Sequence, residues 1–113
     1  MITLYGINNC DTVKKAQKWL NANNINYVFH DFKKQGISEE LLSQFVSNKP
    51  WSELLNKRST TFRQLPEEIK NNLTDEVMFN AVLEQPTLLK RPLLDTNNEL
   101  HLGFKEAQYQ ELF

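Results

Sequence analysis

Short β-prone stretches near both ends of the chain predict four strands. The first pair comprises residues 2–6, which end in glycine, and residues 25–30, in which large apolar side chains occupy every second position. The second pair comprises residues 93–95 and 99–102, and residues 96–98 between them have a turn-forming composition. We expect the second pair to form an antiparallel hairpin.

A helix is predicted between the first two strands. It opens at Asp11-Thr12, and it places Val13, Ala16 and Leu20 on one face. Its lysines, which should point to water, are Lys14, Lys15 and Lys18. Because strand, helix and strand follow one another within about thirty residues, they form a βαβ unit with parallel strands.

Helix-start signals recur through the middle of the chain. Ser38 precedes two glutamates and an apolar helical pattern, which makes it an expected N-cap. Pro50 and Pro66 each suit the start of a short helix. Thr74 is expected to cap a further helix that must end before Pro86.

The remaining segments complete the order of the elements. We expect residues 56–65 to be irregular because they are polar, and a last helix to start at Gly103-Phe104. The order β-α-β, helices, β-β-α indicates an α/β (α+β) fold with a mixed four-stranded sheet. We expect one domain over residues 1–113, with a helical insertion at about 37–86.

The composition is that of an ordinary globular protein. Hydrophobic residues make up 40% and charged residues 24%, and 13 basic and 14 acidic side chains give a net charge of −1. Without a basic excess, we expect no direct nucleic-acid binding. The N-terminal residues do not resemble a signal peptide, and no apolar run reaches the roughly 20 residues of a membrane span. We therefore expect a cytoplasmic protein with no membrane partner.

Cys10 is the single cysteine, and it falls between the first strand and the first helix. One cysteine excludes an intramolecular disulfide and a cysteine-rich zinc site. Because helix N-termini stabilise thiolates, and Lys14 and Lys15 add positive potential that Asp11 opposes, we expect a nucleophilic thiol. The alternative is an inert, structural cysteine. Val13 stands where a Cys-x-x-Cys motif has its second cysteine, so an external thiol must resolve any mixed disulfide.

Arginines supply candidates for anion binding. Arg91-Pro92 directly precedes a strand, which favours a cis peptide bond. If this proline faces the active-site cysteine, as such a proline does in thioredoxin-like folds, Arg91 is placed to hold a carboxylate or an oxyanion beside the thiolate. The alternative is an ordinary loop proline with a solvated arginine. Arg58 and Arg63 could reach the same pocket, or could belong to a solvated loop. We expect no metal site and structural roles for the two histidines, His30 and His101.

Several segments together resemble the arsenate reductase (ArsC) family. Residues 2–6 and 9–16 resemble its opening, residues 54–63 its central motif, and residues 90–93 its arginine–cis-proline motif. Gly103-Phe104 resembles the start of its last helix. The resemblance covers almost the whole chain, and it is closest to the YffB-like subgroup and the related Spx regulators.

The resemblance implies a thioredoxin-like fold, in which such a proline faces the active-site cysteine. Cys10 matches the nucleophile that attacks arsenate in the reductases, and Arg91 matches an oxyanion-binding arginine. The expected residues for binding substrate or glutathione are Arg91, Pro92, Arg58, Asn9 and Lys14. The resemblance further implies glutathione as a co-substrate, glutaredoxin as a partner and no bound cofactor.

The chain departs from the reductases at three places. Gly6 stands where they have a histidine, Asn56 where they have an arginine (Arg58 is shifted by two), and Leu102-Gly103 near their third arginine. These departures favour a glutathione-dependent monothiol oxidoreductase acting on disulfides over an arsenate reductase. A third hypothesis is a Spx-like regulator that binds the α subunit of RNA polymerase, although Val13 removes the Cys-x-x-Cys switch of many Spx proteins.

Overall fold

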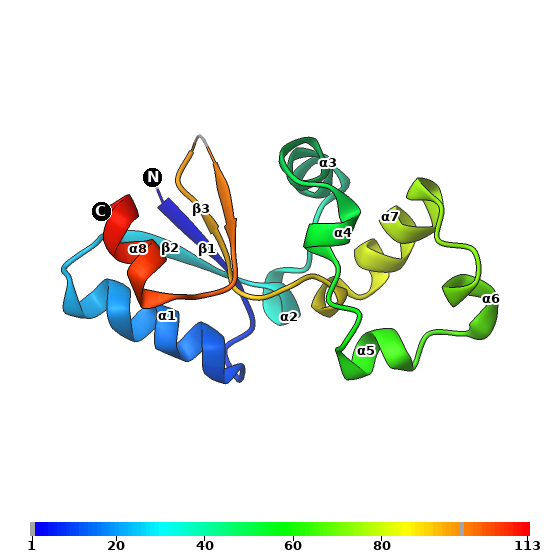
Figure 1. Cartoon of the computed structure of the whole chain (residues 1–113), viewed down its shortest axis with the longest axis horizontal. Helices are drawn as coiled ribbons and strands as arrows, with labels where there is room; N and C mark the ends of the chain where they lie inside the picture. The colour runs from blue at the N-terminus through cyan, green and yellow to red at the C-terminus, as the bar shows by residue number, and fades with distance from the viewer. Residues whose placement is uncertain (1, 98) are drawn as a thin grey trace. The chain divides into compact units, whose positions relative to one another are not determined.

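Four strands form one mixed sheet in the computed structural model, which describes residues 2–97 and 99–113 (Figure 1). The strands are β1 (Ile2–Gly6), β2 (Tyr27–Asp31), β3 (Leu93–Asp95) and β4 (Leu100–Leu102). They lie in the order β2-β1-β3-β4. β1 and β2 are parallel, while β3 is antiparallel to both β1 and β4. The predicted mixed sheet, parallel βαβ unit and C-terminal hairpin are therefore confirmed.

The register of the sheet brings four strand ends together. Gly6 lies opposite Asp31, and Leu93 lies opposite Leu102. Since β3 also begins opposite the end of β1, the ends of β1, β2 and β4 meet the start of β3. We call this end of the sheet, defined by Gly6, Asp31, Leu93 and Leu102, the Cys10 end, because the chain leaves β1 there toward Cys10.

Two helices, α1 (Asp11–Ala22) and α8 (Glu106–Leu112), pack on the sheet through a shared core. The buried members of this core are Leu4, Val13, Ala16, Leu20, Leu94 and Tyr109. The ring of Tyr109 meets the rings of Trp19 and Phe104 edge-on, at centroid distances of 5.6 and 4.7 Å. The face of α1 that the sequence predicts to be apolar is the buried one, and its three lysines are exposed.

The described chain divides into two compact units. The sheet unit comprises the residues through Gln35 together with Arg91–Phe113, and it includes the short helix α2 (Phe32–Gln35). The helical unit is Gly36–Lys90. Its helices are α3 (Glu39–Asn48), α4 (Trp51–Leu54), α5 (Thr60–Arg63), α6 (Glu67–Lys70), α7 (Asp75–Glu84) and the 3₁₀ helix η1 (Pro86–Leu88). Within the described residues, none of the helices is long and apolar enough to cross a membrane.

The predicted helix starts in the helical unit are confirmed by their caps. The hydroxyl of Ser38 accepts a hydrogen bond from the Leu41 N–H at 3.1 Å, and that of Thr74 accepts one from the Val77 N–H at 3.2 Å. Pro50 and Pro66 occupy the N-caps of α4 and α6, and α7 ends two residues before Pro86. These starts depend on contacts between near neighbours in the sequence.

The expectation that residues 56–65 are irregular holds for residues 56–59 and 64–65 but was wrong for residues 60–63. These four residues form α5, which begins after Ser59 because the Ser59 hydroxyl accepts a hydrogen bond from the Phe62 N–H at 3.1 Å. Thr61 joins this turn to η1 through a hydroxyl–hydroxyl contact of 3.1 Å with Thr87. A partner distant in the sequence therefore stabilises a segment whose polarity predicted a loop.

Two predicted boundaries also move. β2 begins at Tyr27 rather than at residue 25, because the Ile25 N–H donates to the Leu20 carbonyl at 3.0 Å. The last helix begins at Glu106 rather than at Gly103-Phe104. Gly103 has φ of +76°, which is incompatible with a right-handed helix and which glycine adopts without steric cost.

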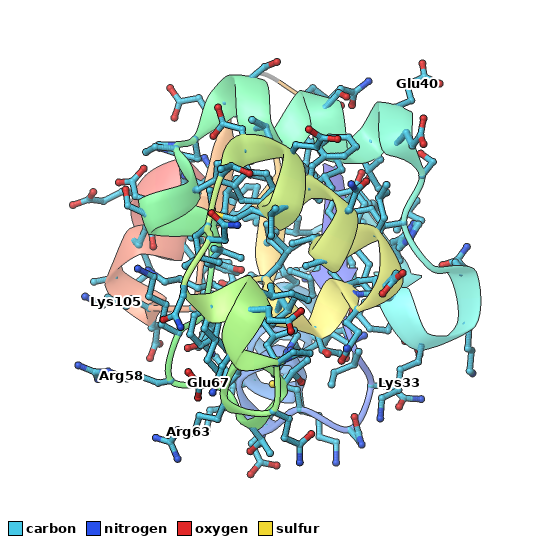
Figure 2. The ribbon with its side chains drawn as sticks, turned by 90° about the vertical axis from the view of Figure 1, so that its right-hand side faces the viewer. Lys33, Glu40, Arg58, Arg63, Glu67 and Lys105 are labelled. Carbon is cyan, nitrogen blue, oxygen red and sulfur yellow. The ribbon has the colours of Figure 1, made fainter. Side chains whose placement is uncertain are left out.

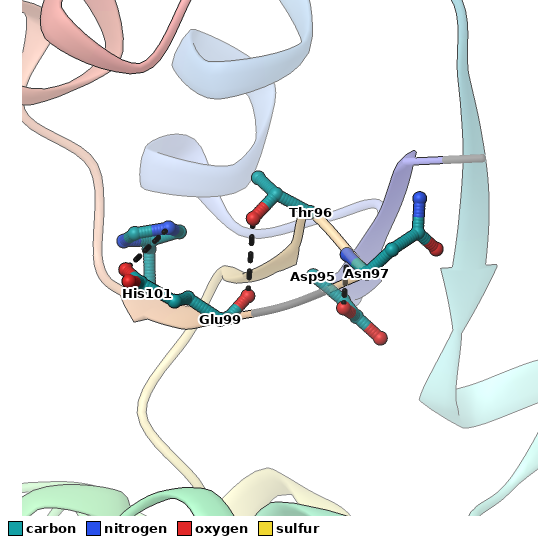
Figure 3. Close-up of polar contacts among 5 residues, drawn as sticks. All are labelled: Asp95, Thr96, Asn97, Glu99 and His101. Atoms are coloured by element: carbon teal, nitrogen blue, oxygen red, sulfur yellow. Dashed lines mark hydrogen bonds and ion pairs between the residues drawn. The ribbon is translucent and has the colours of Figure 1, made fainter.

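The β3–β4 turn is closed by short-range polar contacts (Figure 3). The Asn97 N–H donates to Asp95 Oδ1 at 2.8 Å, and the Thr96 hydroxyl donates to the Glu99 carbonyl at 3.4 Å. Asn98, also part of the predicted turn, lies outside the described residues. Because the turn fixes the β3–β4 register, it also fixes which residues lie at the Cys10 end.

Candidate functional site

Cys10 is the N-cap residue of α1, with an extended backbone (φ −98°, ψ 124°). Its N–H donates to the Ile7 carbonyl at 3.4 Å, and its carbonyl accepts from the Lys14 N–H at 3.0 Å. The side chain is half-buried and packs against the core beneath α1. Backbone bonds thus tie Cys10 both to the exit of β1 and to the first turn of α1.

The thiol of Cys10 makes no capping hydrogen bond to the first turn of α1. The first-turn N–H groups of a helix carry partial positive charge, and a negative group at the N-cap position is stabilised by them. A half-buried thiol at the start of a twelve-residue helix can therefore be reached by a substrate and can develop negative charge in a favourable field. This is the position that the sequence predicts.

Asn9 and Lys14 flank Cys10 on either side. Asn9 is exposed in the turn before α1, and Lys14 is exposed in the first turn of the helix. Both belong to the sheet unit; Asn9 directly precedes Cys10, and Lys14 follows it by four residues. Their predicted part in binding substrate or glutathione remains a prediction.

Arg91 and Pro92 lie at the Cys10 end of the sheet. Their peptide bond is cis, as predicted. Pro92 is buried, its carbonyl accepts a hydrogen bond from the Gly103 N–H at 2.8 Å, and the next residue, Leu93, begins β3 beside β1. Arg91 is half-buried. The sheet therefore brings Arg91-Pro92 to the same edge as the loop that carries Cys10.

Arg58 and Arg63 belong to the helical unit, where both are exposed and extend away from the ribbon (Figure 2). The Arg58 N–H donates to Asn56 Oδ1 at 3.2 Å, so Asn56 organises the turn that presents Arg58. Arg63 is the last residue of α5. A role for either arginine beside the thiol remains a prediction.

Asp31 is a buried acid at the Cys10 end that sequence reasoning missed. Its Oδ1 accepts a hydrogen bond from the Lys33 N–H at 2.9 Å, while its own N–H donates to Gln35 Oε1 at 3.1 Å. These bonds start α2 directly after β2. The sequence feature that could have indicated this buried acid is its position at the end of β2, directly before the buried Phe32.

The histidines have aromatic and acidic neighbours. The ring of His30 lies 5.1 Å from that of Tyr5 and 5.5 Å from that of Phe32. His101 Nε2 lies 3.7 Å from Glu99 Oε2 (Figure 3). Across residues 2–97 and 99–113, no group of three or more His, Cys, Asp or Glu side chains could hold a metal ion.

The chain is similar in sequence and in structure to several known proteins. A family model described as the ArsC family matches residues 5–112. A solved structure called YFFB protein is 39% identical, covers 98% of this chain and 97% of its own, and superposes with a TM-score of 0.93. A solution structure of an arsenate reductase (ArsC) related protein from Brucella melitensis is 46% identical and covers 97% and 92%, with a TM-score of 0.79. The predicted thioredoxin-like fold is thereby confirmed.

A regulator is also among the relatives. The global transcriptional regulator Spx of Lactiplantibacillus plantarum is 29% identical over 110 residues, which are 96% of this chain and 83% of that protein. Nearly the whole of this chain therefore matches both a protein described as arsenate reductase related and a protein described as a transcriptional regulator.

Proposed function

Since this chain belongs to the ArsC family, we propose that it is a glutathione-dependent monothiol reductase with Cys10 as its nucleophile. The observation that carries the proposal is the position of its one cysteine. Cys10 is half-buried at the N-cap of α1, at the same end of the sheet as Arg91. A single thiol can exchange disulfides, but it needs an external thiol to complete a cycle.

The proposed reaction balances with two molecules of glutathione. The Cys10 thiolate attacks one sulfur of a substrate disulfide, which forms a mixed disulfide and releases the other half as a thiolate. A first glutathione thiolate attacks Cys10 Sγ, which releases the second half of the substrate and leaves Cys10 glutathionylated. A second glutathione regenerates Cys10 and leaves as glutathione disulfide, so the two electrons come from glutathione.

Arg91 is assigned the binding of an anion in this reaction. Glutathione has two carboxylates, and a guanidinium binds a carboxylate through two parallel hydrogen bonds. Asn9, Lys14, Pro92 and Arg58 are proposed to complete the binding surface, as the family resemblance suggests. Glutaredoxin is the proposed protein partner that could deliver or remove glutathione.

Replacing the thiol tests the proposal. Wild-type protein incubated with a glutathione-containing mixed disulfide is expected to form a Cys10–glutathione adduct and to release it again with reduced glutathione, as followed by mass spectrometry. Cys10→Ser should abolish both the adduct and the glutathione-dependent turnover. A turnover unchanged by this substitution would rule the proposal out.

Arsenate reduction is a second candidate because a close structural relative is described as arsenate reductase related. Against it, the Asn56 side chain is engaged in its own turn, and Gly6 stands where the reductases have a histidine. We expect no arsenate-dependent oxidation of glutathione when glutaredoxin is present. A rate that disappears in Cys10→Ser would establish the reductase instead.

A regulator is the candidate from another functional class, and the likeness to Spx over 96% of the chain favours it. A Spx-like protein would bind the C-terminal domain of the RNA polymerase α subunit rather than turn over a substrate. A pull-down with that domain separates the two functions. Under the proposed enzymatic function we expect no retention above that seen with an unrelated protein of similar charge.

A further inference from the structure

Gly6 and Val13 approach each other more closely than two side-chain-bearing residues could. A Cβ atom at Gly6 would lie 2.7 Å from Val13 Cγ2 and 3.3 Å from Cγ1. Ordinary carbon–carbon contacts are about 3.5–4.0 Å. The last residue of β1 therefore has to be glycine as long as valine occupies position 13 and α1 stays where it is.

Val13 cannot move aside by itself. It is fully buried, and a β-branched residue inside a helix is restricted to essentially one χ1 rotamer. Added bulk at Gly6 must therefore displace the first turn of α1, which carries Cys10.

Cys10 follows any such displacement of α1, because its carbonyl accepts a hydrogen bond from the Lys14 N–H at 3.0 Å. We propose that Val13 is a positioning residue for Cys10, and that its contact with Gly6 holds the thiol at the Cys10 end of the sheet, where Arg91-Pro92 also lies. This inference rests on the proposed function, since the position of Cys10 matters only where Cys10 is the reacting group. It also gives a reason for the glycine: a side chain at position 6 and a valine at position 13 exclude each other.

The test measures the field at the thiol instead of turnover. Iodoacetate is anionic and iodoacetamide is neutral, so the ratio of their second-order rate constants at Cys10 reports the local positive potential. In wild-type protein we expect this ratio to exceed that of N-acetylcysteinamide at least about threefold. Gly6→Ala should lower the ratio at least about twofold, and Gly6→Ala with Val13→Ala should restore it, because alanine at position 13 leaves room for the added methyl group.

A matched control separates positioning from general destabilisation. Leu20→Val changes a buried residue on the same face of α1 but at the other end of the helix, and it should leave the ratio unchanged. A folded Gly6→Ala variant with the wild-type ratio would overturn the proposal. So would a folded double variant that does not recover the ratio, or a wild-type ratio no higher than that of N-acetylcysteinamide.

If Gly6→Ala does not fold, the comparison of Val13→Ala with the double variant decides. Val13→Ala removes the methyl groups that contact Gly6 and should lower the ratio. In the double variant the alanine at position 6 fills this space again, and the ratio should rise. Equal ratios in these two proteins would overturn the proposal. The proposed function fails by a different observation, namely the absence of a Cys10–glutathione adduct in the wild-type protein.

Discussion

At the scale of single residues, Cys10 is fixed mainly by the hydrogen bonds of its backbone, while its side chain contributes only packing against the core beneath α1. Its N–H and carbonyl are both hydrogen-bonded, while its thiol makes no capping bond. A substitution that keeps the backbone should therefore remove the chemistry and leave the fold intact. This makes position 10 suitable for a direct test of function.

Cys10→Ser is expected to change the free energy of unfolding by no more than about 1 kcal/mol. Serine is a better N-cap than cysteine, which offsets the loss of sulfur packing against the core beneath α1. Urea unfolding followed by circular dichroism checks this. A loss of several kcal/mol would mean that Cys10 is structural, which is the alternative reading of a lone cysteine.

Tyr109 makes the free energy of unfolding depend on pH in the alkaline range. Burial raises the pKa of Tyr109 well above its ordinary value of 10, so the native state keeps a proton that the unfolded chain loses above about pH 10. The stabilisation is complete below that pH and is lost as the pH rises further. The Tyr5 pKa is also raised, by burial and then by Asp95, so Tyr5 adds a contribution of the same sign.

Tyr109→Phe should flatten this dependence. Its buried hydroxyl has no hydrogen-bond partner among the described residues, so phenylalanine should cost little at pH 7 and should stabilise the protein relative to wild type at about pH 10.5. Urea unfolding of both proteins at the two pH values measures the difference. Parallel losses in the two proteins would show that Tyr109 is not the titrating group.

At the scale of elements, short-range caps begin several helices of the helical unit. Ser38 and Thr74 each accept a hydrogen bond from the N–H three residues ahead, and Ser59 does the same for the four-residue helix α5. Such a bond satisfies a first-turn donor that has no partner inside the helix. The beginnings of these helices are therefore encoded locally.

Ser38→Ala is expected to reduce the free energy of unfolding by about 1 kcal/mol, because the Leu41 N–H loses its acceptor. Ser47 in the same helix provides the control, since its exposed hydroxyl donates to the Ser43 carbonyl and caps no first-turn N–H. Ser47→Ala should change stability by less than about 0.5 kcal/mol. Similar effects of the two substitutions would mean that the cap does not stabilise α3.

At the scale of the whole molecule, segments from the N-terminal and C-terminal parts of the chain meet at one end of the sheet. The Cys10 loop follows β1, whereas Arg91-Pro92 precedes β3, and the antiparallel pairing of these two strands brings them together. The Pro92 carbonyl is further tied to Gly103 after β4. Arg58 and Arg63 belong to the other compact unit.

Arg91→Ala should lower kcat/KM for the glutathione-dependent reaction about tenfold, which corresponds to about 1.4 kcal/mol for a lost charge-assisted hydrogen bond. Lys18→Ala, which removes an exposed positive charge from the middle of α1, is the matched control and should have little effect. Arg58→Ala, assayed beside them, tests whether the helical unit contributes the second arginine that the sequence predicts. Equal rates for Arg91→Ala and Lys18→Ala would remove Arg91 from the site.

Much of the fold follows from near neighbours in the sequence. The buried face of α1 follows from the spacing of Val13, Ala16 and Leu20, and the starts of α3 and α7 follow from Ser38 and Thr74. The predictions from the sequence were wrong where a contact between distant residues or an unusual backbone conformation determines the structure. The Thr61–Thr87 contact stabilises a segment that looked irregular, and the left-handed backbone at Gly103 delays the last helix.

The sequence by itself determined that this protein has one thiol, that the thiol begins a helix, and that an Arg-Pro pair precedes a strand. These are properties of neighbouring residues, so periodicity and capping were sufficient to find them. Only the tertiary structure decided that Gly6 touches Val13 and that Asp31 lies beside Gly6. The family resemblance implied that Pro92 faces Cys10, and the pairing of β1 with β3 brings Arg91-Pro92 to the end of the sheet where Cys10 lies. The reason is physical: strand pairing and close packing depend on segments far apart in the chain, and no local pattern specifies their register.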